Sequence, residues 1–421
     1  EFGPNGDQDI IKCGSYTGDG TDQFIDLGFE PQWLLIKNTS SAQNWVLFDT
    51  MRGLPVLGGE RLYPNTSDAE EALATSLSFT RLSANGFELD TNWGGIVNAS
   101  GDTYIYMAIR RGPLAPPESG TEVFAIGNGD VIQTPTFQSD FVTDLGIWRG
   151  YSTTHNTIVQ TRLTQGKQLY TNLTNAEASN GYANFDYMDG FFGDASGGFP
   201  AVLSDYVAWM FRRAPKFFDV VAYTGQDTLG AAIPHNLGVA PELVIIKSRT
   251  AARDWMVALP LVGPDGREQS LSLNLTSGVR NERMFPSGGL LPDENNFYLA
   301  SENSVNTSSD TYIAYLFATL PGVSKVGSYT GNSGTQTIDC GFTTGARFVM
   351  VKAANTSGAW FVWDTARGIV SGSEPYLRLN SSVAEENGYD AIDPDSSGFV
   401  LNNVGTGTND SGTTYIFYAI A

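Results

Sequence analysis

The sequence predicts an all-β protein made of four tandem repeats, each of them an antiparallel β-sandwich of roughly 100 residues. Three observations support this fold class. One strand-like segment recurs at the end of each repeat, short apolar or alternating segments lie between turns, and the 421 residues include 47 glycines and 19 prolines. Frequent turn-forming residues between short segments are typical of β-proteins with many short strands.

The recurring closing segment gives the period of the repeat. It aligns on four tyrosines, in the order Tyr104, Tyr206, Tyr312 and Tyr415. These tyrosines are separated by 102, 106 and 103 residues, which exceeds the period of solenoids or propeller blades and matches a small domain. The nearly continuous apolar run YIYMAI in the first copy predicts a central strand that is buried on both faces.

Other landmarks recur in the same order within each copy. The segment PQWLLIKNTSSAQNWVLFDT predicts a hairpin of two strands around a polar loop. In three copies a lysine stands eight residues before a tryptophan, as Lys37 with Trp45, Lys247 with Trp255, and Lys352 with Trp360. The second copy has Arg149 and Thr157 at these positions. Because a residue that recurs in several copies is first a residue of the fold, we interpret the tryptophans as buried core.

The later landmarks complete each copy and set its boundaries. An asparagine follows the hairpin in each copy, at Asn65, Asn172, Asn274 and Asn380, and a Gly-Phe pair comes later in three copies. The segment SDAEEALATSL (67–77) predicts one short helix. The predicted domains are residues 1–116, 117–216, 217–321 and 322–421, and the second is the most divergent. Their short proline-containing linkers predict an extended or compact array rather than flexibly tethered units.

Charge and cysteine content exclude several classes of protein. The formal net charge is −21, whereas nucleic-acid-binding proteins carry the opposite balance to replace phosphate counterions. No apolar run is long enough to span a membrane, so we expect no membrane insertion. Two cysteines, Cys13 and Cys340, are too few for a disulfide framework and occupy different repeat positions, so we expect two buried free thiols.

The repeat resembles a known family. The order GF-x-P-x-W-(L/V)-(L/I)-I-K, then W-x-x-(F/W)-D-T-x-R, then an N-x-(S/T)-x-A-E segment, then YI-x-x-AI, is similar to a repeat domain of unknown function in structural proteins of tailed bacteriophages, many of them marine. The likeness covers nearly the whole chain from residue 11. It implies an extracellular virion component such as a tail or tail-fibre protein, with other virion proteins as partners and a homo-oligomeric state. It implies no catalytic residues.

Catalytic and metal-binding patterns are weak in this sequence. His155 and His235 lie in different repeats, and no zinc, serine-hydrolase or EF-hand pattern is complete. The segment DPDSSG (393–398) begins like a calcium loop but lacks the glutamate at position 12, so we interpret it as a polar turn. We therefore expect no enzymatic activity and no cofactor, while a loosely bound calcium ion between loops stays open.

The best candidate site is the stretch NFDYMDGFFGDASGGF (184–199) in the divergent repeat. Aromatic rings and carboxylates alternate there, and proteins hold sugars by stacking rings on apolar faces and hydrogen bonding hydroxyls. We predict a binding site at Asp186, Tyr187, Asp189 and Phe192. Two alternatives stay open: the rings are core and the acids are solvated, or two of the carboxylates Asp186, Asp189 and Asp194 form a glycosidase site.

The Asp49–Arg52 and Asp364–Arg367 pairs are interpreted as structural ion pairs at the end of the hairpin strand. Function is expected where the copies differ. The leading hypothesis is a tail fibre or similar exposed component that binds a host-surface glycan or an adjoining virion protein. The alternatives are a purely architectural capsid or tail decoration protein and a polysaccharide-degrading enzyme.

Overall fold

The protein is described here from a computed structural model, which covers residues 10–50, 60–72, 80–89, 95–113, 115–130, 133–164, 166–179, 183–193, 203–262, 268–280, 282–286, 290–402 and 407–421. Within these ranges the chain forms antiparallel β-sheets and one short α-helix, α1 (Asn303–Asn306), so the all-β prediction is confirmed. None of its helices in these ranges has the length and apolar character needed to cross a membrane.

The strands fall into four successive groups, which we call units 1 to 4. Unit 1 contains β1 (Ile11–Thr17), β2 (Gln23–Asp26), β3 (Pro31–Asn38), β4 (Trp45–Asp49), β5 (Glu60–Arg61), β6 (Glu71–Ala72), β7 (Thr80–Ser83), β8 (Gly86–Leu89) and β9 (Thr103–Arg110). Unit 2 contains η2 (Gly120–Glu122), β10 (Phe124–Asn128), β11 (Phe137–Gln138), β12 (Leu145–Gly150), β13 (Ile158–Thr161), η3 (Arg162–Thr164), β14 (Leu169–Tyr170), β15 (Ala183–Asn184), β16 (Gly190–Gly193), η5 (Leu203–Asp205) and β17 (Tyr206–Phe211).

The last two groups repeat this plan. Unit 3 contains α1, β18 (Phe218–Thr224), β19 (Ala231–Pro234), β20 (Leu243–Ser248), β21 (Met256–Val262), β22 (Glu268–Ser272), β23 (Asn296–Leu299) and β24 (Thr311–Phe317). Unit 4 contains β25 (Ser324–Thr330), β26 (Gln336–Asp339), β27 (Phe348–Ala353), β28 (Trp360–Asp364), β29 (Leu377–Arg378), β30 (Ile392–Asp395), β31 (Gly398–Leu401) and β32 (Thr414–Ile420).

Each unit is built from a large and a small antiparallel sheet. The large sheets have the equivalent orders β1-β9-β3-β4, β10-β17-β12-β13-β14, β18-β24-β20-β21-β22 and β25-β32-β27-β28-β29. The recurring closing strand is therefore central in its sheet, paired with the opening strand on one side and the first hairpin strand on the other. The small sheets are β2-β8-β7, β11-β16-β15, β19-β23 and β26-β31-β30. Both sheets contribute to one buried cluster within each unit, as a sandwich requires.

The repeated tyrosines and asparagines hold this fold together. The four closing-strand tyrosines are buried, as predicted. Tyr16 stacks on Tyr104 with ring centroids 5.0 Å apart, and Tyr329 stacks on Tyr415 at the same distance. The Asn380 side chain accepts a hydrogen bond from the Trp360 backbone N–H at 2.8 Å, and the asparagines of units 1 and 3 do the same. The asparagine thus satisfies the first N–H of the second hairpin strand.

The glycine of the Gly-Phe pair is required by close strand contact. A Cβ atom at Gly86 would lie 2.1 Å from the Ile25 carbonyl oxygen, and one at Gly398 would lie 2.1 Å from the Ile338 oxygen. Both distances are shorter than any van der Waals contact. Any larger residue would therefore push the two strands of the small sheet apart.

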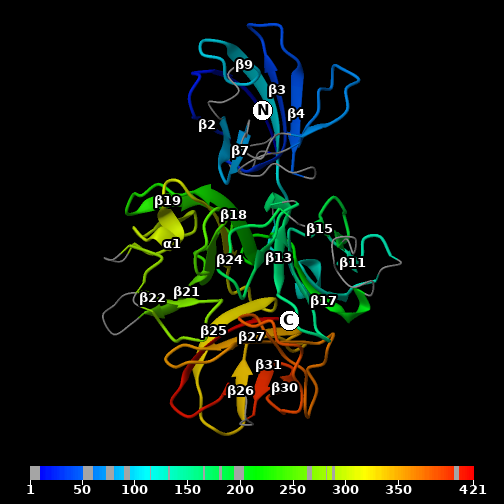
Figure 1. Cartoon of the computed structure of the whole chain (residues 1–421), viewed down its shortest axis with the longest axis vertical. Coiled ribbons are helices and arrows are strands. Elements are labelled where there is room, and N and C mark those ends of the chain that lie inside the picture. The colour runs from blue at the N-terminus through cyan, green and yellow to red at the C-terminus, as the bar shows by residue number, and fades with distance from the viewer. Residues whose placement is uncertain are drawn as a thin grey trace.

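Units 2, 3 and 4 form a closed ring, and unit 1 lies apart at one end (Figure 1). The outer faces of the three large sheets in the ring turn toward a common axis. There they share one apolar cluster that includes Trp209 of β17, Phe317 of β24 and Tyr418 of β32. Each closing strand of the ring is consequently buried on both faces, as predicted.

Three equivalent joints close the ring. At each joint the hairpin loop of one unit contacts the segment after the repeated asparagine of another. The Arg253 N–H of unit 3 donates to the Thr174 carbonyl of unit 2 at 3.0 Å. The same bond joins unit 4 to unit 3, and unit 2 to unit 4, in the pairs Gly358 with Thr276 and His155 with Ser382. A ring made this way uses the same two surfaces of every unit.

The repeated lysine also belongs to these joints. Lys352 donates to the carbonyls of Thr276 and Ser277 in unit 3 at 3.1 and 3.0 Å, and Lys247 donates to Thr174 at 3.0 Å. Burial lowers the pKa of both lysines to about 8. In unit 2 the substituted Arg149 reaches three carbonyls of unit 4, which explains why a longer cation replaces lysine there.

The three repeated hairpin tryptophans, Trp45, Trp255 and Trp360, divide into two groups. Trp255 and Trp360 are buried, and their indole N–H groups donate across the joints, to Tyr170 at 2.8 Å and to Ser272 at 2.9 Å. Trp45 is only half-buried, so its assignment to the core is wrong. Its position in the sheet is equivalent, but unit 1 has no neighbouring unit on that face.

The closing strand of unit 1 differs for the same reason. Along β9 (Thr103–Arg110) the residues alternate between buried and accessible, so the prediction of burial on both faces is wrong for YIYMAI. Two smaller predictions also fail. Cys13 and Cys340 are both free thiols, but Cys13 is exposed. Residues 71–72 form strand β6 instead of the expected helix, and residues 73–77 lie outside the described residues.

A buried ion cluster attaches unit 1 to the ring. Arg213 binds both carboxylate oxygens of Glu30 in unit 1, at 2.7 and 2.5 Å, and it also binds Asp219 of unit 3 at 2.7 Å. Arg111 lies 3.5 Å from each of the same two acids. Burial opposes ionisation of Asp219, but Arg213 and Arg111 hold its pKa below the usual value. Unit 1 is therefore fixed to the ring by paired charges.

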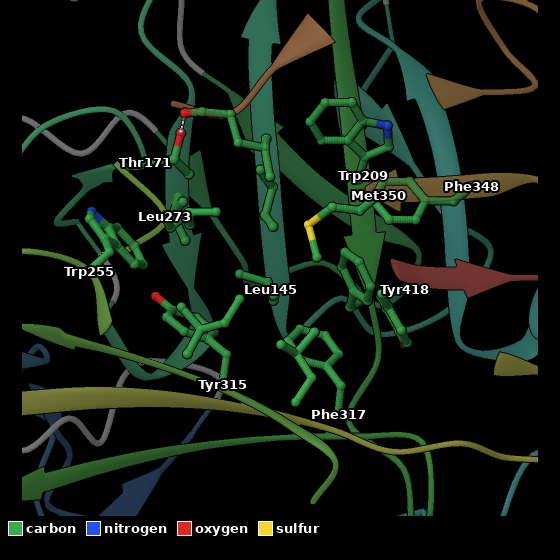
Figure 2. Close-up of a pocket in the computed structure, with 16 residues that line it drawn as sticks. Leu145, Thr171, Trp209, Trp255, Leu273, Tyr315, Phe317, Phe348, Met350 and Tyr418 are labelled. Atoms are coloured by element: carbon green, nitrogen blue, oxygen red, sulfur yellow. Dashed lines mark hydrogen bonds between the residues drawn. The ribbon is translucent and has the colours of Figure 1, made fainter. Parts of the chain in front are cut away.

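The ring axis encloses a small apolar cavity of about 40 Å³. Figure 2 shows side chains from all three units around it, including Trp209, Tyr315 and Met350, and the hydrogen bond from Thr171 to the Leu379 carbonyl. Apolar cavities that bind small hydrocarbons are several times larger, at about 150 Å³. This cavity is therefore a packing gap rather than a ligand site.

Candidate functional site

A groove of about 630 Å³ lies between unit 1 and unit 2. Unit 1 contributes Trp33 from β3 and Asp49 from the end of β4. Unit 2 contributes Arg212, which follows β17, and Met188, which lies in the predicted binding stretch. The complete lining is Gln32, Trp33, Asp49, Thr50, Arg111, Gly112, Val142, Asp144, Arg162, Leu163, Met188, Arg212, Arg213 and Val220.

Arginines outnumber acids in the lining of the groove although the chain is strongly acidic. Four arginines and two aspartates line it, whereas the whole chain carries −21. Arg213 and Arg111 are committed to the ion cluster. Arg162 donates to the Thr143 carbonyl at 2.9 Å and lies 3.7 Å from Asp144, and burial lowers its pKa. These three arginines therefore already have protein partners.

Arg212 is different from the other arginines of the groove. It is half-buried, and its side chain has no hydrogen-bond or ion-pair partner among the described residues. Its backbone N–H donates to the Val123 carbonyl at 2.8 Å, which fixes the base of the side chain. A guanidinium at the wall of a groove whose N–H donors have no partner among the described residues can bind a carboxylate, sulfate or phosphate group.

Three predicted site residues, Asp186, Tyr187 and Asp189, lie on the turn between β15 and β16, and Phe192 lies in β16 itself. Asp186 and Asp189 are exposed, whereas Tyr187 and Phe192 are half-buried with ring centroids 6.3 Å apart. The Asp186 N–H donates to the Asn184 side chain at 2.8 Å. The structure thus brings the four residues to one accessible surface beside the groove, and Met188 of the same turn is 66% exposed and lines the groove.

The same stretch also supplies core residues. Phe185 and Phe191 are fully buried and stack with ring centroids 5.2 Å apart. The alternation of aromatic and acidic residues therefore reflects a segment with one face toward the core and one face toward solvent. Asp194, the third acid of the stretch, lies outside the described residues.

Sequence reasoning missed the groove itself. Trp33 belongs to a repeated strand and Arg212 to a repeated closing segment, so both positions were interpreted as residues of the fold. The second arginine of the RR pair, at Arg213, is committed to the ion cluster, and the first is not. The only sequence signal was an RR pair in an acidic chain, which does not reveal which arginine keeps its donors.

The other candidate residues have structural partners. The His235 ring lies 3.1 Å from the Asp293 carbonyl through Nε2, and its Nδ1 accepts the Leu237 N–H at 3.2 Å. Asp364 and Arg367 form a buried ion pair at 2.7 Å, as predicted, whereas Arg52 of the first pair lies outside the described residues. Asp395 of the calcium-like segment accepts the Ser397 N–H within a tight turn. Among the described residues, no group of three or more His, Cys, Asp and Glu is placed to hold a metal ion.

One buried carboxyl group predicts a pH effect on stability. Burial raises the pKa of Glu374 in unit 4 from 4.5 to about 7, although Oε1 accepts the N–H groups of Ala391 and Ile392 at 2.8 Å each. Between those pH values the folded carboxyl keeps a proton that the unfolded one has lost. The free energy of unfolding is therefore expected to fall as the pH rises from about 4.5 to about 7.

Urea unfolding of the wild type and Glu374→Gln at pH 5 and pH 7 tests this expectation. The amide cannot ionise and keeps the oxygen that accepts both N–H groups, so its loss of stability between the two pH values is expected to be smaller. Glu118→Gln, at an exposed position, is the matched control. Equal losses for wild type and Glu374→Gln would show that Glu374 is already ionised at pH 5.

A comparison with known protein families gives a match over most of the chain. A family model described as a domain of unknown function (DUF7483) matches residues 8–113 and 121–421. No curated protein and no solved structure matches the chain.

Proposed function

The chain belongs to the DUF7483 family of domains of unknown function, and from its geometry we propose that it is an exposed structural component of a virion, such as a tail fibre, that binds an acidic polysaccharide of the host surface. The observation that carries this proposal is the groove, where Arg212 has donors to spare and Trp33 offers an aromatic ring. Guanidinium groups bind carboxylates and sulfates, while indole rings stack on the apolar faces of sugars.

The surroundings of the groove support binding rather than catalysis. The Asp49 and Asp144 carboxylates stand on its walls among four arginines, and Asp144 already accepts the Arg213 N–H at 2.7 Å. Both histidines lie in other places, and His235 is held by backbone groups. The exposed turn with Tyr187 and Asp189 extends the same surface, so a polymer longer than one sugar can contact both.

A purely architectural role is the second candidate, because one observation favours it. Units 2 to 4 bury their most apolar sheet faces around the ring axis, which makes a stiff body suited to spacing other parts of a particle. The two roles predict different results in a binding experiment. An architectural protein has no need of a polysaccharide site in its groove.

Affinity electrophoresis in gels containing alginate, an acidic polyuronate, or dextran, a neutral polymer, tests the binding proposal. We expect alginate to retard the wild type and dextran to leave its mobility unchanged. Arg212→Gln and Trp33→Ala are expected to reduce the retardation at least about tenfold, the loss of one charge-assisted contact or stacked ring.

Lys325→Gln is the matched control, because it removes a similar charge from β25 in unit 4, far from the groove. It is expected to behave as the wild type. Equal retardation of the wild type and the two groove variants would exclude the groove as the site. Absence of any retardation, in alginate and in a sulfated glycan such as carrageenan, would leave the architectural role.

A further inference from the structure

Unit 1 carries the same joint-forming groups that close the ring of units 2 to 4. Its lysine is Lys37 and its tryptophan is Trp45. The hairpin N–H that stands six residues after the lysine belongs to Gln43, and the carbonyl two residues after the repeated asparagine belongs to Ser67. At the three ring joints the hairpin N–H, the carbonyl and the lysine or arginine at these offsets bond to a neighbouring unit, and the tryptophan does so at two of them. Unit 1 therefore has both surfaces of a joint.

In unit 1 these groups have no partner in another unit. The Lys37 ammonium donates at 2.6 Å to the Gln43 carbonyl of its own hairpin. The Trp45 indole N–H, the Gln43 N–H and the Ser67 carbonyl make no hydrogen bond to any described residue. Residues 64–71 around the acceptor carbonyl are exposed. The donor and acceptor surfaces of a joint are thus both present and both vacant.

The sheet face between these two surfaces is apolar. Ile105 on β9 is 41% exposed, whereas its counterparts Val207 and Ile313 in the ring are fully buried and Ile416 is 3% exposed. Ile105 pairs with Lys37 of β3 and Ser15 of β1. The face continues from it with half-buried apolar residues, namely Trp33, Leu35, Trp45, Leu47, Met107 and Ile109. Their counterparts in units 2 to 4 include Ile147, Trp209 and Tyr315 at the ring axis. We call this surface the outer face of unit 1.

We propose that three copies of this chain associate through the outer face of unit 1 and form a second ring with the geometry of units 2 to 4. The joint is heterologous, because the hairpin of one unit contacts the asparagine segment of the next. Such contacts make a closed ring when the rotation between neighbours divides a full turn. The rotation between units of this fold closes after three, as the single-chain ring shows. Two copies would leave one donor and one acceptor surface open.

Contiguous apolar surface of this kind on a soluble protein marks an association site. The occupant is a copy of unit 1 because the surface is built like the surfaces that already bind copies of the same fold within the chain. The net charge of −21 per chain opposes the approach of three chains, and salt screens that repulsion. Association is therefore expected to strengthen between low salt and 0.5 M NaCl.

Sedimentation equilibrium and light scattering of the full chain in 0.5 M NaCl test the proposal. The expected mass is three times the 45.4 kDa of one chain. Ile105→Asp places a charge on the outer face, at the position whose ring counterparts are buried, and is expected to reduce the mass to that of one chain. Tyr389→Asp, at a 42% exposed apolar position in unit 4, is the matched control and is expected to remain trimeric.

A second measurement identifies the contact independently of stability. Gln43→Cys with Ser67→Cys in a Cys13→Ser background places thiols where the ring has the Arg253–Thr174 bond of 3.0 Å. Oxidation is expected to give a covalent trimer on a non-reducing gel, and no larger species. A monomeric wild type at high concentration, a dimer, a ladder of open chains or a trimer that survives Ile105→Asp would each overturn the proposal. Trp33 belongs to both the groove and the outer face, so association would bury one wall of the groove. Arg212 lies outside the outer face, so Arg212→Gln is expected to lose polysaccharide binding while the mass stays that of a trimer.

Discussion

Replacing Arg213 by alanine is expected to lower the free energy of unfolding by about 3–5 kcal/mol, the usual loss when one partner of a buried ion pair is removed. Arg213 is 3% exposed and binds Glu30 and Asp219, which are 5% and 1% exposed. Without it, the two buried carboxylates keep the neutral donors of Asn236, at 2.8 and 3.3 Å, and the more distant cation Arg111 at 3.5 Å. Because Glu30 belongs to unit 1 and Asp219 to unit 3, the loss also weakens the attachment of unit 1 to the ring.

Differential scanning calorimetry and guanidinium unfolding measure both consequences. Arg213→Ala is expected to separate an early transition of unit 1 from the transition of the ring. The matched control is Arg378→Ala, because the Arg378–Glu386 pair has a similar distance, 2.6 Å, but both side chains are 32% exposed. Such an exposed pair contributes about 0–1 kcal/mol. If the two variants lose the same stability, burial of the Arg213 cluster is not what stabilises the junction.

Replacing Trp360 by alanine is expected to cost about 3–5 kcal/mol, the usual effect of truncating a fully buried aromatic residue. The indole of Trp360 is buried in the apolar cluster shared by units 2 to 4. Its N–H donates to the Ser272 carbonyl of unit 3 at 2.9 Å. The truncation opens a cavity between units 3 and 4 and leaves the Ser272 carbonyl without that donor. The substitution is therefore expected to destabilise the joint between units 3 and 4 as well as unit 4 itself.

Trp45→Ala is the matched control, since it removes the same side chain from the equivalent position of unit 1, where the indole is half-buried. In an Ile105→Asp background, which prevents the proposed association, it is expected to cost about 1 kcal/mol, in proportion to the smaller buried area. Chemical unfolding of both variants gives the comparison. Equal costs would show that contacts within a unit, and not the ring joint, set the contribution of these tryptophans.

The fold of the single units could be predicted well from the sequence because the contacts that define it are made within one unit. The stacked pair Tyr16 and Tyr104, the asparagine that accepts the tryptophan N–H, and the glycine that admits a close strand all act within one copy of the fold. Such residues recur whenever the fold recurs. Their order and spacing along the chain therefore indicated the sheets and the central position of the closing strand.

The ring could not be predicted from the same pattern. Its joints are made largely by backbone carbonyls, such as those of Thr174 and Thr276, and every residue type offers a carbonyl. The lysines that reach them look identical in all copies, although Lys37 bonds within its own hairpin while Lys352 bonds to unit 3. A repeat shows which residues are equivalent and leaves open which copies are neighbours.

The candidate site was predictable only in part. Exposed Asp186 and Asp189 with half-buried Tyr187 and Phe192 follow from the divergence of the second copy, since divergent loops are free to face a partner. Arg212 and Trp33 lie in conforming stretches, and they form a groove only because unit 1 is fixed against unit 2 by Arg213 and Glu30. That contact joins residues 183 positions apart.

The closed ring within one chain also changes what a single substitution can do. In an assembly of three identical subunits every amino-acid change appears at all three contacts, so a change that suits one contact must suit the others. Here each contact has its own residues, and Arg149 stands at one of them while Lys247 and Lys352 stand at the other two. Unit 2 could thus lose its hairpin tryptophan and vary its loops without loss of the other two contacts. A ring made from one chain therefore allows one third of a nearly symmetric body to differ from the other two thirds.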